Sequence, residues 1–163
     1  RQSKIANGAG MIFEGKIDVG VPPAKTWDFP IDIDRFAACL PGLEKVTKID
    51  DHTFDGTIGA TVGPISGKFE FRSTIVESIP PKEMLVRTEG KDSVTKSTMN
   101  VKMTVTLTEP IENRTELGYH ANVEIKGRLV ILGDMVLRAT AVLLLEEFSR
   151  RLRKELEANS GNV

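Results

Sequence analysis

Hydrophobic and polar residues alternate along several stretches of the chain. In the first stretch, Met11, Phe13, Ile17 and Val19 share one face, and charged residues occupy the other face. The same period of two recurs further along, at 54–62, 69–75, 83–89 (more weakly), 101–107 and 117–125. Because successive side chains of a strand point to opposite faces, this pattern predicts half-buried strands. Short turns such as Gly63-Pro64 separate the stretches, so we expect an antiparallel sheet with one face toward water.

Two short helices are predicted after the first strand. Pro22-Pro23 suits a first helical turn, and this helix would run through Trp27 until Pro30 removes the amide that the next turn requires. The second helix would span residues 35–40.

The second short helix carries the only cysteine of the chain, Cys39, and a Pro-Gly pair ends it. Asp32 or Asp34 would cap its beginning. A reactive thiolate needs a positive environment or a helix N-terminus, but Cys39 lies near the C-terminus of its helix. We therefore interpret Cys39 as a small buried core residue rather than a nucleophile or a metal ligand.

After Gly127 the period changes from that of a strand to that of a helix. Residues 129–156 contain no proline and one glycine, and Leu, Arg, Glu, Ala and Val dominate them. This composition predicts one long helix of roughly 40 Å at 1.5 Å per residue. A curved antiparallel sheet with one apolar face needs a cover, so we expect the helix to lie across it in an α+β fold, with a cavity between them.

Composition and charge argue against nucleic-acid binding and against a membrane-spanning segment. The 163 residues suffice for one domain, and a formal net charge of −1 gives no field that would attract nucleic acid. We assign residues 1–10 to an expression tag or disordered tail, 11–158 to the domain, and 159–163 to a second disordered tail. The mostly apolar stretch 129–145 contains two charged residues in its middle and is not expected to span a membrane. With one cysteine and no recognisable signal peptide, a cytoplasmic location is expected.

Five short motifs resemble a known family. They are FEGKIDV at 13–19, PPAKTW at 22–27, AACLPG at 37–42, VGPISGKF at 62–69 and KGRLVILG at 126–133. With them, the chain resembles the G-subunit family of carbon monoxide dehydrogenase, part of the START-like (SRPBCC) superfamily. The resemblance implies a helix-grip fold with a ligand tunnel, and a role beside a molybdenum hydroxylase, attaching it to the membrane or to its quinone pool.

The chain departs from that family's pattern in two places. Pro30 falls where family members usually continue their first helix. Met135, Val142 and Leu143 stand on the outer face of the long helix where basic residues are common.

No pattern in the sequence indicates catalysis or metal binding. His52 and His120 fall in a turn and on a polar strand face, and no His or Cys spacing suits zinc. The acid pairs Asp50-Asp51 and Glu146-Glu147 are typical of solvated surface, and no nucleophile with a base can be assembled. We therefore expect no metal site and no catalytic residue.

Large side chains on the predicted inner faces are candidates for ligand contact. They form either an ordinary core or, as the resemblance implies, the lining of a tunnel. From the short helices and the strands the candidates are Trp27, Phe36, Phe69, Phe71, Met103 and Tyr119, and from the inner side of the long helix Val136, Thr140 and Leu144.

The long helix carries a second apolar stripe on its opposite side, although covering one sheet requires only one stripe. We expect this stripe to meet a partner chain, a membrane surface, a second copy or a deeper core. The residues expected at that contact are Ile131, Met135, Ala139 and Val142, followed by the basic Arg150 and Arg151.

Three classes of function remain. We favour a non-catalytic accessory protein of a molybdenum hydroxylase such as carbon monoxide dehydrogenase. It would bind a quinone- or lipid-like molecule, need no resident cofactor, and lie in the cytoplasm or peripherally at the inner face of the membrane. The alternatives are an enzyme of the polyketide cyclase or dehydratase type, and a purely structural interaction domain.

Overall fold

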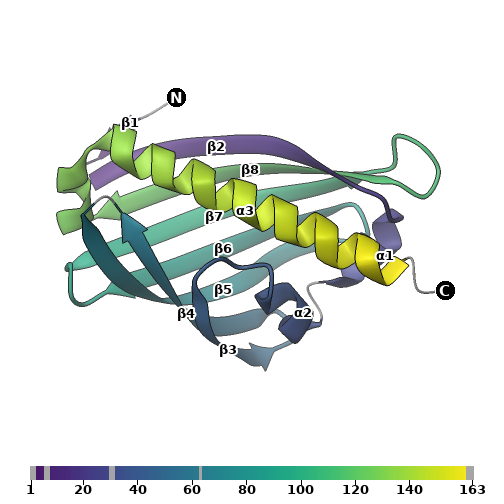
Figure 1. Ribbon diagram of the computed structural model, residues 1–163, viewed down its shortest axis with the longest axis horizontal. Helices are drawn as coiled ribbons and strands as arrows, with labels where there is room; N and C mark the ends of the chain where they lie inside the picture. The colour runs from purple at the N-terminus through teal and green to yellow at the C-terminus, as the bar shows by residue number, and fades with distance from the viewer. Residues whose placement is uncertain (1–2, 6–7, 30–31, 63, 161–163) are drawn as a thin grey trace.

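The computed structural model describes residues 3–5, 8–29, 32–62 and 64–160. The eight strands within these ranges form one antiparallel sheet in the order β1-β2-β8-β7-β6-β5-β4-β3, and the long helix α3 lies across its concave face (Figure 1). This confirms the α+β helix-grip architecture expected from the sequence. The strands are β1 (Ser3–Ile5), β2 (Gly8–Val19), β3 (Leu43–Asp50), β4 (Thr53–Val62), β5 (Ile65–Ile79), β6 (Glu83–Asp92), β7 (Ser97–Thr108) and β8 (Thr115–Lys126). The helices are α1 (Pro23–Asp28), α2 (Ile33–Ala37), the 3₁₀ helix η2 (Arg128–Leu132) and α3 (Asp134–Ser160).

The sheet is larger than the sequence pattern predicts. β1 pairs with the first residues of β2, so part of the segment assigned to an N-terminal tail belongs to the sheet. The pattern does not predict β3, because most of its side chains are exposed on both faces at the sheet edge. An edge strand of this kind has no buried face and therefore no alternation.

The prediction of one uninterrupted helix over 129–156 is wrong at its beginning. Residues 128–132 form η2, and Gly133 follows with φ of +86° before α3 begins at Asp134. A positive φ is easily reached by glycine and breaks a right-handed helix. The described part of α3 also extends beyond the predicted end, to Ser160, into the segment assigned to a C-terminal tail.

The short helices begin and end close to their predicted limits. The side chain of Asp32 caps α2 by accepting a hydrogen bond from the Arg35 amide, and α2 begins two residues earlier than predicted. Gly42, with φ of +79°, then turns the chain so that its carbonyl accepts a 2.9 Å hydrogen bond from the Gly59 amide in β4. Pro30, predicted to interrupt the first helix, lies outside the described residues.

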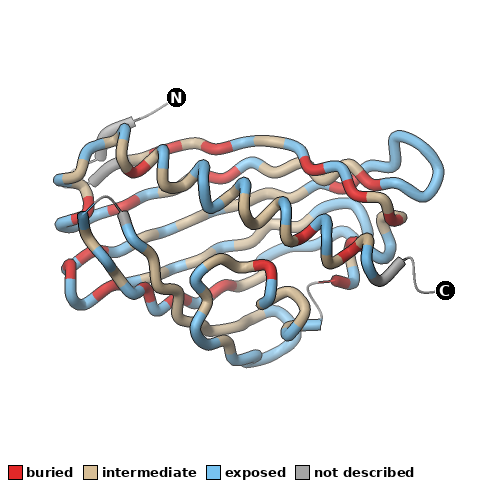
Figure 2. Tube along the Cα trace, in the orientation of Figure 1, coloured by how far each residue is buried: buried red, intermediate tan, exposed pale blue. Residues whose placement is uncertain are grey.

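Most of the buried apolar residues fall into two separate clusters rather than one core. The C-terminal cluster packs under the second half of α3, and the N-terminal cluster packs under η2 and the first half of α3. The C-terminal cluster contains Ile17, Val19, Val21, Phe29, Cys39, Leu152 and Leu156. The N-terminal cluster contains Met11, Phe13, Phe69, Ile125, Leu129 and Leu137. Figure 2 shows that strand positions beneath the middle of α3 are mostly intermediate in burial.

Candidate ligand-binding cleft

Between the two clusters, apolar side chains of the concave face remain partly accessible to solvent. Their register with the buried core residues of β8 and β2 places them on the side facing α3. They are Met84 and Val86 in β6, and Val101, Met103 and Val105 in β7, all of them half-buried. Side chains in a closed core are packed without gaps, so their partial exposure indicates space that the protein does not fill.

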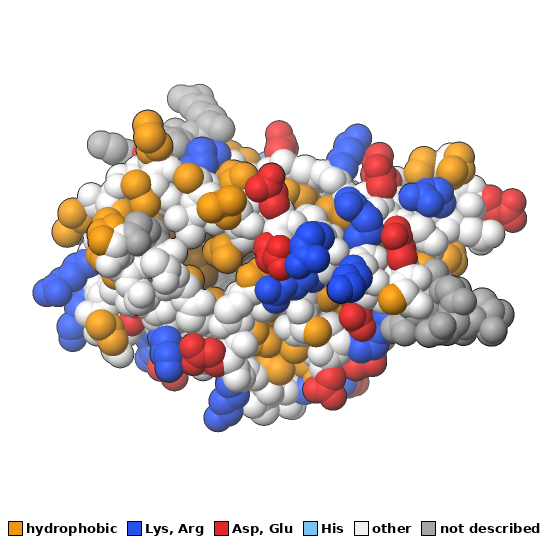
Figure 3. All heavy atoms as spheres, in the orientation of Figure 1, with side chains coloured by type: hydrophobic (Ala, Val, Ile, Leu, Met, Phe, Trp, Pro, Cys, Tyr) orange, Lys and Arg blue, Asp and Glu red, His pale blue; other side chains and the backbone are white. Residues whose placement is uncertain are grey.

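A space-filling view agrees with this interpretation. Figure 3 shows a hollow beside α3 on the helix-covered side of the molecule, with hydrophobic side chains on its floor. We call the space between α3 and the middle of the sheet the cleft, and the five residues on the sheet face toward α3 the cleft floor. It is open at the side of α3 rather than enclosed along its length as a tunnel.

A chain of edge-to-face aromatic contacts connects the helices to the sheet on the β4–β5 side. Phe36 of α2 contacts Phe29, Phe54 and Phe148, with ring centroids 6.2, 6.1 and 6.1 Å away. Phe54 in turn contacts Phe71 at 6.1 Å. Such contacts add to the energy of simple area burial, and they fix the rings that border the cleft.

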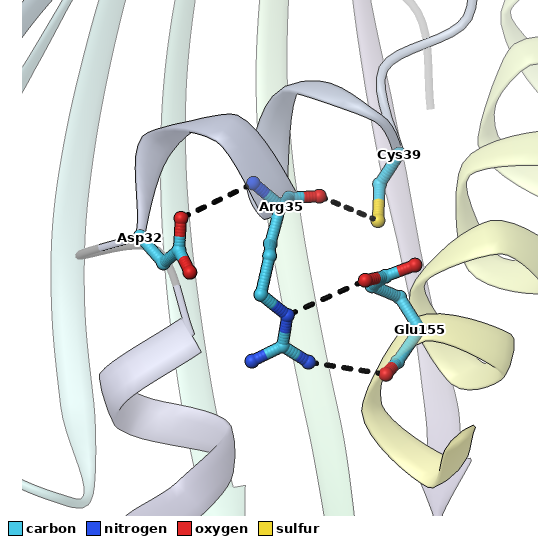
Figure 4. Close-up of polar contacts among 4 residues, drawn as sticks. All are labelled: Asp32, Arg35, Cys39 and Glu155. Atoms are coloured by element: carbon cyan, nitrogen blue, oxygen red, sulfur yellow. Dashed lines mark hydrogen bonds and ion pairs between the residues drawn. The ribbon is translucent and has the colours of Figure 1, made fainter. Parts of the chain in front are cut away.

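The end of the cleft at α2 is closed by polar contacts to α3 (Figure 4). Arg35 Nε donates to Glu155 Oε1 at 3.3 Å, and Arg35 Nη2 donates to the Glu155 carbonyl at 3.1 Å. The Arg35 guanidinium also lies 4.8 Å from the centre of the Phe29 ring. Nearby, the Gly20 amide donates to Glu157 Oε2 at 2.7 Å. These contacts tie the second half of α3 to α2 and to the end of β2.

Cys39 is a core residue of this closed end, as the sequence indicated. It is fully buried, and its thiol lies 3.7 Å from the Arg35 carbonyl, to which it donates (Figure 4). Burial, followed by the nearby Glu155 carboxylate, raises the pKa of Cys39 to about 11. The thiol therefore stays protonated at neutral pH, which makes it a poor nucleophile.

Polar side chains on the concave face are few. In the centre of the sheet, the hydroxyls of Ser73 in β5 and Thr88 in β6 lie 2.7 Å apart and hydrogen-bond each other. On β8, the half-buried Tyr119 packs against the C-terminal cluster, and its hydroxyl lies over Gly15, where a Cβ atom would be 2.6 Å from it. Burial raises the pKa of Tyr119, so its phenol is neutral and can donate a hydrogen bond.

Two further hollows lie on the opposite, outer face of the sheet. Their volumes are about 480 Å³ and about 920 Å³, and their lining is mixed in charge. Lys102 and Glu124 line the smaller hollow, whereas Glu70, Lys91 and other charged side chains line the larger one. They are therefore distinct from the predicted apolar cavity, which was expected between the sheet and the helix.

The structure brings only some of the predicted ligand residues to the cleft. Met103 lies on its floor, and Phe36 and Phe71 belong to the aromatic chain. Phe69 instead belongs to the buried N-terminal cluster, and Trp27 lies half-buried in α1, outside both clusters.

On α3 the residues that face the sheet differ slightly from those predicted. Val136 and Thr140 are half-buried, and the Thr140 hydroxyl donates to the Val136 carbonyl at 2.9 Å within the helix. Leu144 is exposed, which differs from the prediction, while Ala141 and Leu145 pack against the N-terminal cluster.

The predicted outer stripe faces away from the sheet. Ile131 and Met135 are 82% and 85% exposed, and Val142 is 42% exposed. Ala139 is also exposed. Of the basic residues that follow, Arg150 and Arg151 both donate to the Glu147 carboxylate, each at 2.6 Å, so their charge is partly neutralised within α3.

Several residues of the cleft were not predicted as site residues. Phe54, Ser73, Thr88 and Val101 come together through the pairing of four strands. Strand alternation could have put each on an inner face, but only the register shows that they are neighbours. Phe148 of α3 also contacts Phe36, and this contact depends on where α2 packs.

Neither a metal cluster nor a membrane span occurs in the part of the chain that the structure describes. No group of three or more His, Cys, Asp or Glu side chains among the described residues is arranged to hold a metal ion. No helix within the same ranges combines the length and the apolar character needed to cross a membrane.

Comparison with known proteins identifies a matching family and a protein of similar structure. The family model described as CoxG, the G-subunit of carbon monoxide dehydrogenase, matches residues 15–157. No curated protein matches the sequence. A conserved protein from Geobacillus kaustophilus superposes with a TM-score of 0.83 at 20% identity, over 92% of this chain and 97% of that chain.

Two enzymes share the fold at lower similarity. Norcoclaurine synthase from Thalictrum flavum gives a TM-score of 0.62 at 12% identity, over 93% of this chain and 96% of that one. The Zhui aromatase/cyclase from a Streptomyces species gives 0.57 at 14% identity, over 93% and 94%. At these identities the likeness establishes the helix-grip fold and no more.

Proposed function

Because the chain belongs to the CoxG family of carbon monoxide dehydrogenase, we propose that it is a non-catalytic accessory protein that binds a hydrophobic small molecule in the cleft. The ligand is quinone- or lipid-like, and the protein serves a molybdenum hydroxylase such as carbon monoxide dehydrogenase. The observation that carries the proposal is the row of half-buried apolar side chains under α3. Apolar surface that remains accessible inside a concave site gains free energy when a ligand covers it.

Two pKa shifts support a binding role over a catalytic one. Burial raises the pKa of both Cys39 and Tyr119, so both groups stay protonated at neutral pH and neither can act as an anionic nucleophile or base. The Ser73 and Thr88 hydroxyls bond each other, and their pairing contains no base that would activate them.

The surface beside the cleft supports contact with a membrane surface. Figure 3 shows hydrophobic side chains at the end of the molecule where η2 and the beginning of α3 lie, with Lys and Arg side chains nearby. Ser97 accepts a hydrogen bond from the Leu129 amide, which holds the β6–β7 loop against η2. The end patch formed in this way consists of exposed Val94, Ile131 and Met135 with exposed Lys96, Lys126 and Arg128. A surface that mixes apolar and basic side chains in this way is suited to contact an anionic lipid surface. The protein would take its ligand from that surface and pass it to the host enzyme.

Native mass spectrometry of the purified protein, with organic extraction, tests the binding role. We expect a copurified apolar molecule, or uptake of added 2-methylnaphthalene by the empty protein. Val101→Trp should fill the cleft and abolish uptake, whereas Lys102→Trp, on the outer face of the same strand, should not. If the protein without a copurified molecule takes up no 2-methylnaphthalene, or if both variants take it up equally, the proposal is contradicted.

A further inference from the structure

We propose that the Ser73–Thr88 hydroxyl pair is the polar recognition point of the cleft and selects a ligand with a neutral hydroxyl or carbonyl oxygen at one end. This inference rests on the proposed binding function. It concerns which apolar molecules the cleft prefers, and where their polar end lies.

The pair lies in the centre of the sheet, on the face toward α3. Ser73 is the register partner of Thr88, and Thr88 is the register partner of Val101 on the cleft floor. Ser73 is 5% exposed, whereas Thr88 is half-buried, so a molecule in the cleft can reach the pair from the Thr88 side.

The surroundings of the pair are otherwise apolar. The concave positions next to it on β4, β5, β6 and β7 carry no charged side chain; they are Phe54, Phe71, Ile75, Val86, Gly90 and Val101. In such surroundings Ala and Val would fill the same volume without burying hydroxyl groups. The fold therefore tolerates the two hydroxyls, because they satisfy each other, but does not require them.

The hydrogen bonding leaves capacity for a ligand. A hydroxyl donates one hydrogen bond and can accept two, and only one of the two hydroxyl hydrogens is used between Ser73 and Thr88. The other hydrogen can be donated to a ligand oxygen, and the remaining lone pairs can accept from a ligand hydroxyl. Because the neighbouring positions carry no cation, a neutral oxygen is favoured over a carboxylate, which would lose its hydration without a counter-charge.

Matched probes test this directly. We expect wild-type protein to bind 2-naphthol more tightly than 2-methylnaphthalene, which has a similar shape but no hydroxyl. Thr88→Val and Ser73→Ala should each weaken 2-naphthol binding about three- to tenfold and leave 2-methylnaphthalene binding unchanged. Thr88→Ser should retain most of the affinity for 2-naphthol.

The Thr61 and Ser66 hydroxyls supply the control, since they form a similar pair across β4 and β5 that is exposed, at 3.4 Å. Ser66→Ala should affect neither probe, and far-UV circular dichroism should confirm that every variant is folded.

The results distinguish failure of the Ser73–Thr88 recognition role from failure of the binding function itself. If the variants weaken both probes equally, or neither probe, the pair only packs and the inference is overturned while the binding function stands. If wild-type protein binds neither probe, the proposed function fails and the inference falls with it.

Discussion

The first half of α3 is richer in leucine than the second half, yet more of its large apolar side chains are exposed. The second half buries Leu152 and Leu156 in the C-terminal cluster, and Glu155 and Glu157 connect it to α2 and β2. The first half buries Leu137, while Met135, Leu143 and several neighbours are exposed. Hydrophobic composition therefore does not decide how firmly a helix is held on a curved sheet.

The difference arises near α1 and α2: Arg35 and Phe36 of α2 contact the second half of the helix, and Phe29, which follows α1, belongs to the cluster under it. There the Thr26 hydroxyl of α1 donates to Thr115 of β8 at 3.3 Å, and Arg35 of α2 reaches Glu155. The first half has Arg138, whose Nη1 donates to the Ile12 carbonyl at 3.5 Å and whose guanidinium lies 5.0 Å from the Phe13 ring centre. We infer that the second half anchors the helix and that the first half borders the cleft opening.

Truncation of a buried leucine should separate the two halves most strongly. Leu152→Ala removes a side chain that is 4% exposed and should lower the free energy of unfolding by about 2–5 kcal/mol, because it leaves a cavity. Leu143→Ala, in the exposed part of α3, should change it by no more than about 0.5 kcal/mol. Urea unfolding measures both values. Equal losses would show that both halves are anchored alike.

The ion pair at the closed end should contribute a smaller amount. Arg35→Ala removes two hydrogen bonds to Glu155 and the contact with Phe29, and should cost about 1 kcal/mol. Arg72→Ala is the matched control, because its pair with Asp55 at 2.7 and 2.9 Å is exposed on the outer face. We expect a clearly smaller loss for that variant, since solvent screens an exposed pair. A larger loss for Arg72→Ala in thermal unfolding would reverse this ranking.

The exposed stripe should matter for binding and not for folding. Met135→Glu combined with Val142→Glu should leave the free energy of unfolding within about 0.5 kcal/mol of wild type. Cosedimentation with vesicles of neutral and anionic phospholipid should decrease, because the change adds negative charge within and beside the end patch and removes apolar contact.

Ile111→Glu provides the control for that experiment, since Ile111 is 63% exposed in the β7–β8 loop at the other end of the molecule (Figure 1). It should sediment with vesicles like wild type. Unfolding of the double variant would show that the stripe belongs to the core, and unchanged sedimentation would exclude it from lipid contact.

The smallest effect is expected at the surface carboxylate of Glu147. Hydrogen bonds from Arg150 and then Arg151 lower its pKa from the ordinary 4.5 to about 2. Because the pKa is lower in the folded state than in the unfolded state, the ionised carboxylate stabilises the fold at any pH above its ordinary pKa. This stabilisation is lost as the pH falls from there toward 2. The stability difference between wild type and Glu147→Gln should therefore be greatest near pH 6 and shrink below pH 4. A difference independent of pH in denaturant titrations would refute the role of this carboxylate.

Local patterns in the sequence predicted the elements, but not how they meet. The strict alternation at 101–107 and 117–125 correctly predicted β7 and β8, because one face of each is apolar. β3 lacks a buried face and was missed. The start of α3 depends on the positive φ of Gly133, which the composition of 129–156 does not reveal.

The cleft was only partly predictable for a related reason. Inner faces can be predicted strand by strand, as they were for Met103 and Phe71. The pairing of Ser73 with Thr88 and the contact of Phe36 with Phe54 depend on register and on helix packing, which join residues far apart in the sequence.

Methyl NMR with added 2-methylnaphthalene tests the central claim most directly, because it shows where an apolar ligand lies. We predict shifts in the methyl signals of Val86, Met103 and Val105 on the cleft floor, with little change for Val19 and Val21 in the closed end. Saturating ligand without shifts at the cleft floor would contradict the account. So would shifts confined to Ile12 and Ile49, which line the hollows on the outer face of the sheet.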